Sequence, residues 1–227
     1  MAARIAINGF GRIGRLALRA LYESNRKDLE VVAINDLGPV ATNAHLLKYD
    51  TIHGRYPGKI RVLKKGINLG RGTIRVTAER DPTKLPWGAM GVNLVMECTG
   101  LFTKREAAAK HIEARAKRVL ISAPATGADL TVVYGVNHTK LRKRHRVISN
   151  ASCTTNCLAP IAMVINKAIG IRQGFMTTIH AYTGDQRVQD TLHSDLRRAR
   201  AAAASIIPAS TGAARAVGLV LPELAGR

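Results

Sequence analysis

Short apolar runs alternate along the chain with longer stretches in which apolar residues recur at helical spacing. The first two runs, Arg4 to Ile7 and Leu29 to Asn35, predict buried strands, and the stretch from Arg12 to Ser24 between them predicts a helix. An uninterrupted apolar run is typical of a strand that is buried on both faces, as in a parallel sheet. The chain is therefore predicted to begin with a strand, a helix and a second strand.

The same alternation continues over about 150 residues, which is the usual size of one domain. Further strands are predicted at Lys59 to Leu63, Thr73 to Ala78, Val92 to Glu97, Arg118 to Ile121, Leu130 to Tyr134 and Arg146 to Ser149. Further helices are predicted at Val40 to Lys48, Phe102 to Ala116, Leu158 to Ile169 and Ala213 to Leu221. Glycine-rich turns favour a small antiparallel insertion for the first two of these strands. The whole pattern predicts an α/β fold with a doubly wound parallel sheet, which binds ligands beyond the carboxyl ends of its strands.

A glycine-rich turn lies between the first predicted strand and helix. Gly9, Gly11 and Gly14 stand in the order GxGxxG, and Asp36 ends the second strand 22 residues after Gly14 (36 − 14). The glycines allow a tight turn, close approach of a pyrophosphate, and close packing of helix on strand, while the acid binds a ribose hydroxyl. A glycine-rich turn without a ligand would not require this acid. Because a carboxylate repels a 2′-phosphate, NAD is favoured over NADP.

The run from Ser149 to Cys157 joins a predicted strand to an apolar helix. A thiol at Cys153 would lie at the helix N-terminus, where backbone N–H groups and the helix dipole favour a thiolate. The alternative is an inert cysteine buried in the core. His180 comes 27 positions later (180 − 153), after a predicted strand from Gly174 to Ile179, and would act as proton carrier unless its role is structural.

Two later stretches are candidates for binding anions. Leu196 to Arg200 is rich in arginine, and Ser210-Thr211-Gly212 directly precedes a predicted helix. The backbone N–H groups of a helix start, with an arginine beside them, suit a phosphate. The arginines are equally consistent with the solvated face of a helix.

Composition limits the classes of protein. With 227 residues and 46% hydrophobic residues the chain is long enough for one or two domains with a sizeable core. Three cysteines are too few for a disulfide scaffold, and their spacing does not suggest a metal site. The N-terminus lacks the features of a signal peptide, and no long apolar span is present. We therefore expect a soluble cytoplasmic protein.

The net charge of +20 comes from 35 Lys and Arg against 15 Asp and Glu. Such a field attracts polyanions, and the densest basic run is Lys140 to Arg146. Aromatic residues make up only 4% of the chain and none lies within that run, which argues against a stacking platform for single-stranded nucleic acid. Because of its charge alone, a basic module that binds RNA without catalysis stays open as an alternative, although no motif supports it.

Several motifs together resemble one enzyme family over the whole chain. They are Asn8 to Arg15, Ser149 to Cys157, His180 to Gln186, Asp195 to Arg200 and Ser210 to Ala214. The chain resembles phosphorylating glyceraldehyde-3-phosphate dehydrogenase, with erythrose-4-phosphate dehydrogenase as the nearest related family. Ser122-Ala123-Pro124 and Tyr182-Thr183-Gly184 look like the triose enzyme.

The resemblance implies a thioester mechanism with Cys153 as nucleophile and His180 as base. The substrates would be D-glyceraldehyde 3-phosphate and inorganic phosphate, and the product 1,3-bisphosphoglycerate. The dinucleotide would be bound by Gly9, Gly11, Arg12, Ile13, Gly14, Asp36, Arg80, Thr99 and Ser122. Two anion sites would be formed by Ser152, Thr154, Thr183, Arg198, Thr211 and Gly212. An enzyme that releases its product by hydrolysis instead is disfavoured, because these last residues suit anions.

The resemblance also implies a domain organisation. Residues 1–151 would form the NAD-binding Rossmann domain, and residues 152–227 the first part of an α+β catalytic domain. The family extends well beyond the position of Arg227, so we expect a C-terminally truncated chain that is inactive alone, from a glycolytic or gluconeogenic homotetramer. NAD-specific members usually carry Leu-Pro where Thr191-Leu192 stand here, so use of both NAD and NADP stays open.

Overall fold

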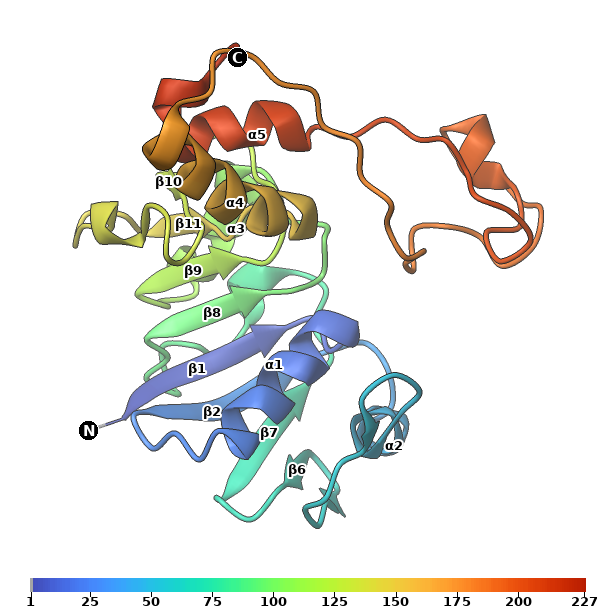
Figure 1. Cartoon of the computed structure of the whole chain (residues 1–227). Helices are drawn as coiled ribbons and strands as arrows, with labels where there is room; N and C mark the ends of the chain where they lie inside the picture. The colour runs from blue at the N-terminus through green and yellow to red at the C-terminus, as the bar shows by residue number, and fades with distance from the viewer. Residues whose placement is uncertain (1) are drawn as a thin grey trace. The chain divides into compact units, whose positions relative to one another are not determined.

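The computed structural model describes residues 2–227. Met1, the first residue of the N-terminal segment that was tested for a signal peptide, lies outside this range. The chain divides into two compact units, Met1–Ser152 and Cys153–Arg227, which are described separately (Figure 1). Within the described range, every helix is too short or too polar to cross a membrane.

The first unit is built on a nine-stranded sheet with the order β10-β11-β9-β8-β1-β2-β7-β6-β5. The strands are β1 (Ala3–Asn8), β2 (Leu29–Asn35), β5 (Arg61–Leu63), β6 (Gly66–Asn68), β7 (Thr73–Thr77), β8 (Leu94–Glu97), β9 (Arg118–Ile121), β10 (Leu130–Thr131) and β11 (Val147–Ser149). From β10 to β7 every neighbouring pair is parallel, and only β5, β6 and β7 pair in antiparallel fashion. The predicted antiparallel insertion is present only in part: β5 and β7 each pair with β6, which was not predicted, and β7 also pairs in parallel with β2. A separate pair, β3 (Tyr49–Asp50) and β4 (Gly54–Arg55), forms a small hairpin.

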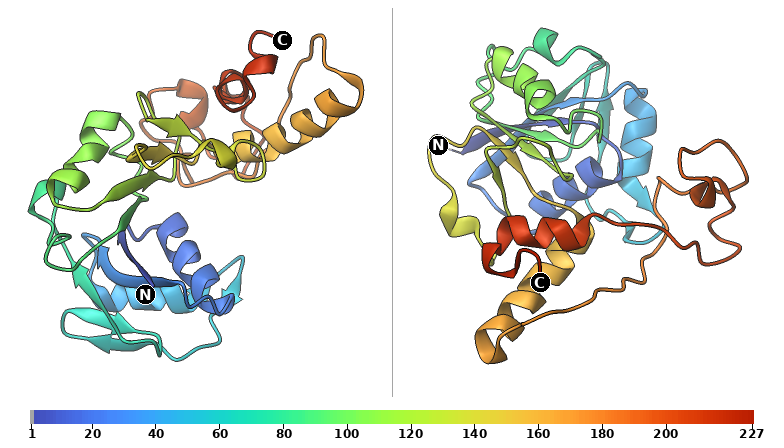
Figure 2. Two further views of the ribbon diagram at one scale, coloured as in Figure 1. Left: turned by 90° about the vertical axis from the view of Figure 1, so that its left-hand side faces the viewer. Right: turned by 90° about the horizontal axis from the view of Figure 1, so that it is seen from above.

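Helices cover both faces of this sheet (Figure 2). α1 (Arg12–Glu23) and α2 (Val40–Lys48) pack against a buried cluster that contains Ile5 and Ile7. α3 (Arg105–Glu113) and the segment around Trp87 cover the other face, where Val95 and Val119 are buried. Because successive residues of a strand point to opposite faces, the apolar runs read from the sequence supply both clusters.

Two predicted elements of this unit are shorter than expected. The helix predicted over Phe102 to Ala116 is α3, which ends where Arg115 adopts a positive φ of 71°. The strand predicted over Leu130 to Tyr134 is only β10, because the chain turns at Val133, whose N–H donates to the Asn137 side chain. Short 3-10 turns occur at Pro82–Lys84 and His138–Lys140.

The second unit contains α4 (Cys153–Ile169) and α5 (Ala213–Val220), which pack on each other. Short 3-10 turns occur at Leu196–Ala199 and Pro222–Leu224. The predicted strand from Gly174 to Ile179 is wrong: residues 172–183 have no strand pairing, and Phe175 and Ile179 are 99% and 95% exposed. An apolar run forms a strand only where a neighbouring strand accepts its backbone hydrogen bonds. After α4 the chain continues as a long irregular segment (Figure 1).

Candidate active site

The glycine-rich turn is closely packed at Gly9 and Gly14 and open at Gly11. Gly9 has a φ of 86°, and a Cβ there would lie 2.8 Å from the backbone nitrogen of Thr99. A Cβ at Gly14 would lie 2.3 Å from the carbonyl oxygen of Gly9, so the helix packs directly on the turn. By contrast, nothing lies within 4 Å of the position of a Cβ at Gly11, where α1 begins. Open space in front of a helix N-terminus fits the dinucleotide expected there.

Asp36 follows β2 at the same edge of the sheet. One carboxylate oxygen accepts a hydrogen bond from the backbone N–H of Phe10 at 2.8 Å. The other accepts from the N–H of Gly38 at 2.9 Å and from Asn43 Nδ2 at 3.0 Å. A carboxylate has about four acceptor positions, so these three bonds leave room for a ribose hydroxyl. Asp36 therefore braces the glycine-rich turn as well as facing the edge where the dinucleotide is expected.

Arg12 has a partner that the sequence did not indicate. Its Nη1 lies 2.9 Å from Asp50 Oδ2, and the Asp50 carboxylate also accepts from the backbone N–H groups of His53 and Ile52. These backbone bonds, first that of His53, together with Arg12 lower the pKa of Asp50 to about 2. The two residues are 38 positions apart, and only the fold brings them together. Ile13 is next to Arg12 on the first turn of α1 and is exposed.

Three further predicted residues follow β7, β8 and β9. Thr99 donates both its backbone N–H and its hydroxyl to Glu97, and Ser122 donates its N–H to the carbonyl oxygen of Glu97 at 3.0 Å. Arg80 is exposed after β7. Burial raises the pKa of the nearby Cys98 thiol to about 11, which Ser122 opposes only in part, so Cys98 is a poor nucleophile. The predicted cofactor residues thus all follow neighbouring strands at one edge of the sheet.

The second unit brings the two predicted catalytic side chains together. Cys153 is the first residue of α4, and its Sγ lies 3.2 Å from His180 Nε2. His180 Nδ1 lies 2.6 Å from the carbonyl oxygen of Ala181. Because a carbonyl only accepts hydrogen bonds, Nδ1 carries a proton and Nε2 is left to exchange one with the thiol. Cys153 is exposed, which excludes the alternative of an inert core cysteine.

The electrostatics of the pair favour charge separation. Partial burial acts to raise the pKa of Cys153, but the bond with His180, the N–H of Thr154 and the imidazolium charge together hold that pKa below its ordinary value. The pKa of His180 is raised, first by its bond to the Ala181 carbonyl and then by the Cys153 thiolate. The arrangement therefore stabilises a thiolate next to an imidazolium.

The candidate anion-binding residues are only partly assembled. Arg198 donates to Asp185 at 2.6 Å and to the carbonyl oxygen of Ser210 at 3.2 Å, which links it to the segment before α5. The Thr183 N–H and hydroxyl both bond to Gln186, while the Thr211 hydroxyl accepts from the Ala213 N–H at 3.2 Å. Gly212 is the N-cap residue of α5. Thr154 follows Cys153 in α4, and Ser152 is the last residue of the first unit.

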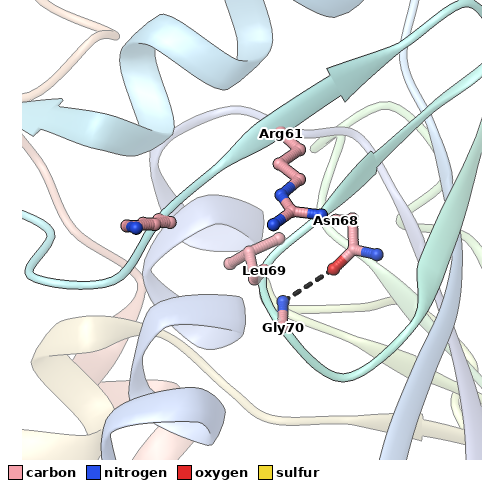
Figure 3. Close-up of a pocket in the computed structure, with 5 residues that line it drawn as sticks. Arg61, Asn68, Leu69 and Gly70 are labelled. Carbon is pink, nitrogen blue, oxygen red and sulfur yellow. Dashed lines mark hydrogen bonds between the residues drawn. The ribbon is translucent and has the colours of Figure 1, made fainter.

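The first unit also contains a hollow of about 400 Å³. Lys59, Arg61, Asn68, Leu69 and Gly70 line it beside the β5–β6 hairpin, and Figure 3 shows Asn68 accepting from the N–H of Gly70. None of the predicted site residues lines it. Across residues 2–227 there is also no group of three or more His, Cys, Asp and Glu side chains placed to bind a metal ion.

Comparison with known proteins gives consistent matches. Residues 3–105 match the NAD binding domain of glyceraldehyde 3-phosphate dehydrogenase, and residues 152–227 match the C-terminal domain of that enzyme. The glyceraldehyde-3-phosphate dehydrogenase of Xanthobacter flavus is 67% identical over 227 residues, which is 100% of this chain and 68% of that protein. The enzymes of Cereibacter sphaeroides and Pseudomonas aeruginosa are 64% and 58% identical, again over 100% of this chain and 68% of their own length.

Proposed function

The chain belongs to the glyceraldehyde 3-phosphate dehydrogenase family, and from this premise we propose which of its residues carry the reaction. The matches confirm the expected α/β fold, the NAD cofactor and the oxidoreductase function. The substrates are glyceraldehyde 3-phosphate and phosphate. The three relatives all bear the name of the triose enzyme, so the erythrose-4-phosphate alternative receives no support.

Cys153 is the nucleophile in this proposal. Its thiolate forms a bond to the aldehyde carbon of the substrate, and the carbonyl oxygen takes up the negative charge. The imidazolium of His180, 3.2 Å from the sulfur, supplies a proton to that oxygen and gives a hemithioacetal. The backbone N–H groups at the start of α4, where Cys153 stands, would donate hydrogen bonds to that oxyanion.

His180 then acts as the base. It takes the hydroxyl proton back as a hydride leaves the same carbon, which makes a thioester at Cys153. NAD supplies the hydride acceptor when it is bound. An oxygen of inorganic phosphate attacks the thioester carbon, the carbon–sulfur bond breaks, and the Cys153 thiolate is regenerated. The bond from His180 Nδ1 to the Ala181 carbonyl holds the ring with Nε2 toward the sulfur throughout.

The remaining predicted residues divide between cofactor and anions. Gly9, Gly11, Arg12, Ile13 and Gly14 would hold the pyrophosphate, Asp36 the adenosine ribose, and Arg80, Thr99 and Ser122 the borders of the dinucleotide. Ser152, Thr154, Thr183, Arg198, Thr211 and Gly212 would bind the substrate phosphate and the attacking phosphate. The link from Arg198 to the segment before α5 supports a shared anion site.

The observation that carries this proposal is the contact between Cys153 and His180. We expect iodoacetamide at neutral pH to alkylate Cys153 rapidly, and glyceraldehyde 3-phosphate to slow that alkylation. Cys157, four residues later in α4 and also exposed, is the matched control: Cys157→Ser keeps the fast alkylation, and Cys153→Ser abolishes it. In His180→Gln the rate should fall to that of an ordinary thiol. Equal alkylation rates for Cys153 and Cys157 in the unsubstituted chain would contradict the assignment.

We also propose a homotetramer in the cytoplasm, as the resemblance implies. The exposed apolar side chains of the second unit, such as Phe175, Ile179 and Ile206, support association with further protein surface. Light scattering after size exclusion would test the assembly. The polyanion-binding alternative predicts instead a salt-dependent retention on heparin that is the same in Cys153→Ser.

A further inference from the structure

A line of buried polar side chains crosses the sheet of the first unit beneath the candidate cofactor site. It runs through the last residues of four neighbouring strands and continues into the layer that covers one face. We call it the polar crossbar; its members in order are Thr77, Asn35, Asn8, Glu97, His111 and Trp87. The register places Asn8 directly between Asn35 and Glu97, and Asn35 opposite Thr77. All except Thr77 are at most 5% exposed.

One end of the crossbar fixes the proton positions on His111. The indole Nε1 of Trp87 lies 3.0 Å from His111 Nδ1. Because an indole N–H can only donate, Nδ1 must accept, and the imidazole proton is on Nε2. Nε2 lies 2.9 Å from Glu97 Oε2 and donates to it. Hydrogen bonds from this side therefore all point toward Glu97.

The other end fixes the orientation of two amides. The side-chain oxygen of Asn35 accepts from the backbone N–H of Glu79 and from the Thr77 hydroxyl, both at 2.9 Å. Its Nδ2 donates to the Glu79 carbonyl oxygen and to Asn8 Oδ1, both at 2.8 Å. This leaves Asn8 Nδ2 to donate to Glu97 Oε2 at 2.6 Å. Hydrogen bonds from this side also point toward Glu97.

The two directions converge on a residue that must only accept. Glu97 receives bonds from Asn8 and His111 on one oxygen and from the backbone N–H and hydroxyl of Thr99 on the other. A carboxylate is the side chain that accepts at both oxygens and donates at neither. A glutamine of the same shape would turn its NH₂ group toward at least one of these donors. Turning the Asn8 amide around would set its NH₂ group against the NH₂ group of Asn35, and moving the His111 proton to Nδ1 would set it against the indole N–H of Trp87.

We propose that Glu97 is a positioning residue that sets the spacing of the loops around the dinucleotide. Gly9 follows Asn8 in the chain, Asp36 follows Asn35, and Thr99 bonds Glu97 directly. A Cβ at Gly9 would meet Thr99 at 2.8 Å, so the glycine-rich turn and the Thr99 loop are in close contact above the crossbar. The inference rests on the proposed placement of NAD at this edge. Glu97 acts through Asn8 and Thr99 and not by touching the cofactor.

The first test needs no substitution. A long-range ¹H–¹⁵N correlation spectrum of the histidine-labelled 227-residue chain should show the His111 ring with a proton on Nε2 and none on Nδ1. The His111 signal is assigned by its loss in His111→Gln. A proton on Nδ1 would overturn the converging arrangement whether or not the chain binds NAD.

The second test measures NAD binding by calorimetry. Glu97→Gln should weaken binding by about tenfold or more, because a buried donor loses its acceptor. Val95→Ala is the control: Val95 is fully buried, two residues earlier on the same strand, and takes no part in the crossbar. Val95→Ala should change the affinity for NAD by less than about twofold, because Val95 makes no hydrogen bond in the crossbar.

A double variant tests the direction of the bonds themselves. Asn8→Asp combined with Glu97→Gln moves the carboxylate one strand along, where it can accept from Asn35, from Gln at position 97, and from His111 Nε2, which lies 3.4 Å from Asn8 Nδ2. We expect it to recover part of the lost affinity. Normal NAD binding by Glu97→Gln, or a double variant no better than the single one, would overturn the role of Glu97. Failure of the unsubstituted chain to bind NAD would instead refute the proposed cofactor placement.

Discussion

Gly11 and Gly14 stand three residues apart in one turn, and the structure predicts opposite consequences for the same substitution. At Gly14 an added methyl group would lie 2.3 Å from the carbonyl oxygen of Gly9, a backbone atom that cannot rotate away. At Gly11 the added methyl group meets nothing within 4 Å, and the backbone φ of −70° suits any residue. Gly14→Ala should therefore damage folding, and Gly11→Ala should damage only ligand binding.

The magnitudes follow from the two environments. Overpacking a rigid site costs about 3 kcal/mol at the upper end of the usual range. Replacing glycine by alanine inside a helix returns about 1 kcal/mol, so the net loss at Gly14 is about 2 kcal/mol. For a unit of this size that loss lowers the Tm by roughly 4–8 °C. Gly11→Ala should change stability by less than about 0.5 kcal/mol.

Differential scanning calorimetry and NAD titration on the same two variants separate these effects. We expect Gly14→Ala to melt earlier, and Gly11→Ala to melt normally but to bind NAD poorly, because its methyl group fills the space in front of the α1 N-terminus. A Gly14→Ala protein as stable as the unsubstituted chain would refute the close packing of α1 on the turn. Normal NAD affinity in Gly11→Ala would refute the placement of the pyrophosphate.

Two further predictions concern ionisation and cofactor choice. Because the pKa of Cys153 is lowered, its thiolate persists as the pH falls below the ordinary thiol range, so Cys153 should still be alkylated rapidly at pH values where the alkylation of Cys157 has already slowed. Mass spectrometry of the two cysteine-containing peptides from pH 5 to 9 measures both rates. Parallel pH profiles would contradict the pairing of Cys153 with His180. Asp36→Ser should weaken NAD binding and reduce the difference in affinity between NAD and NADP, because it removes the charge that repels a 2′-phosphate. Titration of the unsubstituted chain with both dinucleotides tests this. Tighter binding of NADP would refute the role given to Asp36.

The sequence predicted the parts of the fold that depend on local pattern. Buried parallel strands are uninterrupted apolar runs, so β1, β2 and the turn between β1 and α1 were recognisable. The helix predicted from Leu158 begins earlier, at Cys153, because the small polar residues before the apolar run also join α4. The strand predicted from Gly174 to Ile179 failed because a strand is defined by its partner, which the apolar run does not specify. His180 nevertheless reaches Cys153 from an unpaired segment.

The contacts that hold the site in place were not predictable in the same way. Asp50 lies 38 residues from Arg12 in the chain, and only the fold, which brings β3 beside α1, reveals the bond between them. The crossbar depends on register: Asn8 and Glu97 are 89 residues apart, and a shift of one residue would place them on different faces. The pairing of Arg198 with Asp185 likewise needs the course of an irregular segment.

Trp87 is the only tryptophan in the chain, and its indole is fully buried against His111 in the first unit. Intrinsic tryptophan emission therefore follows the melting of the cofactor-binding layer and is silent about α4, α5 and the segment that carries His180. A single cooperative fluorescence transition would say nothing of whether the reactive thiol is still correctly placed, so unfolding of this chain has to be followed with a second signal, such as the rate at which Cys153 is labelled.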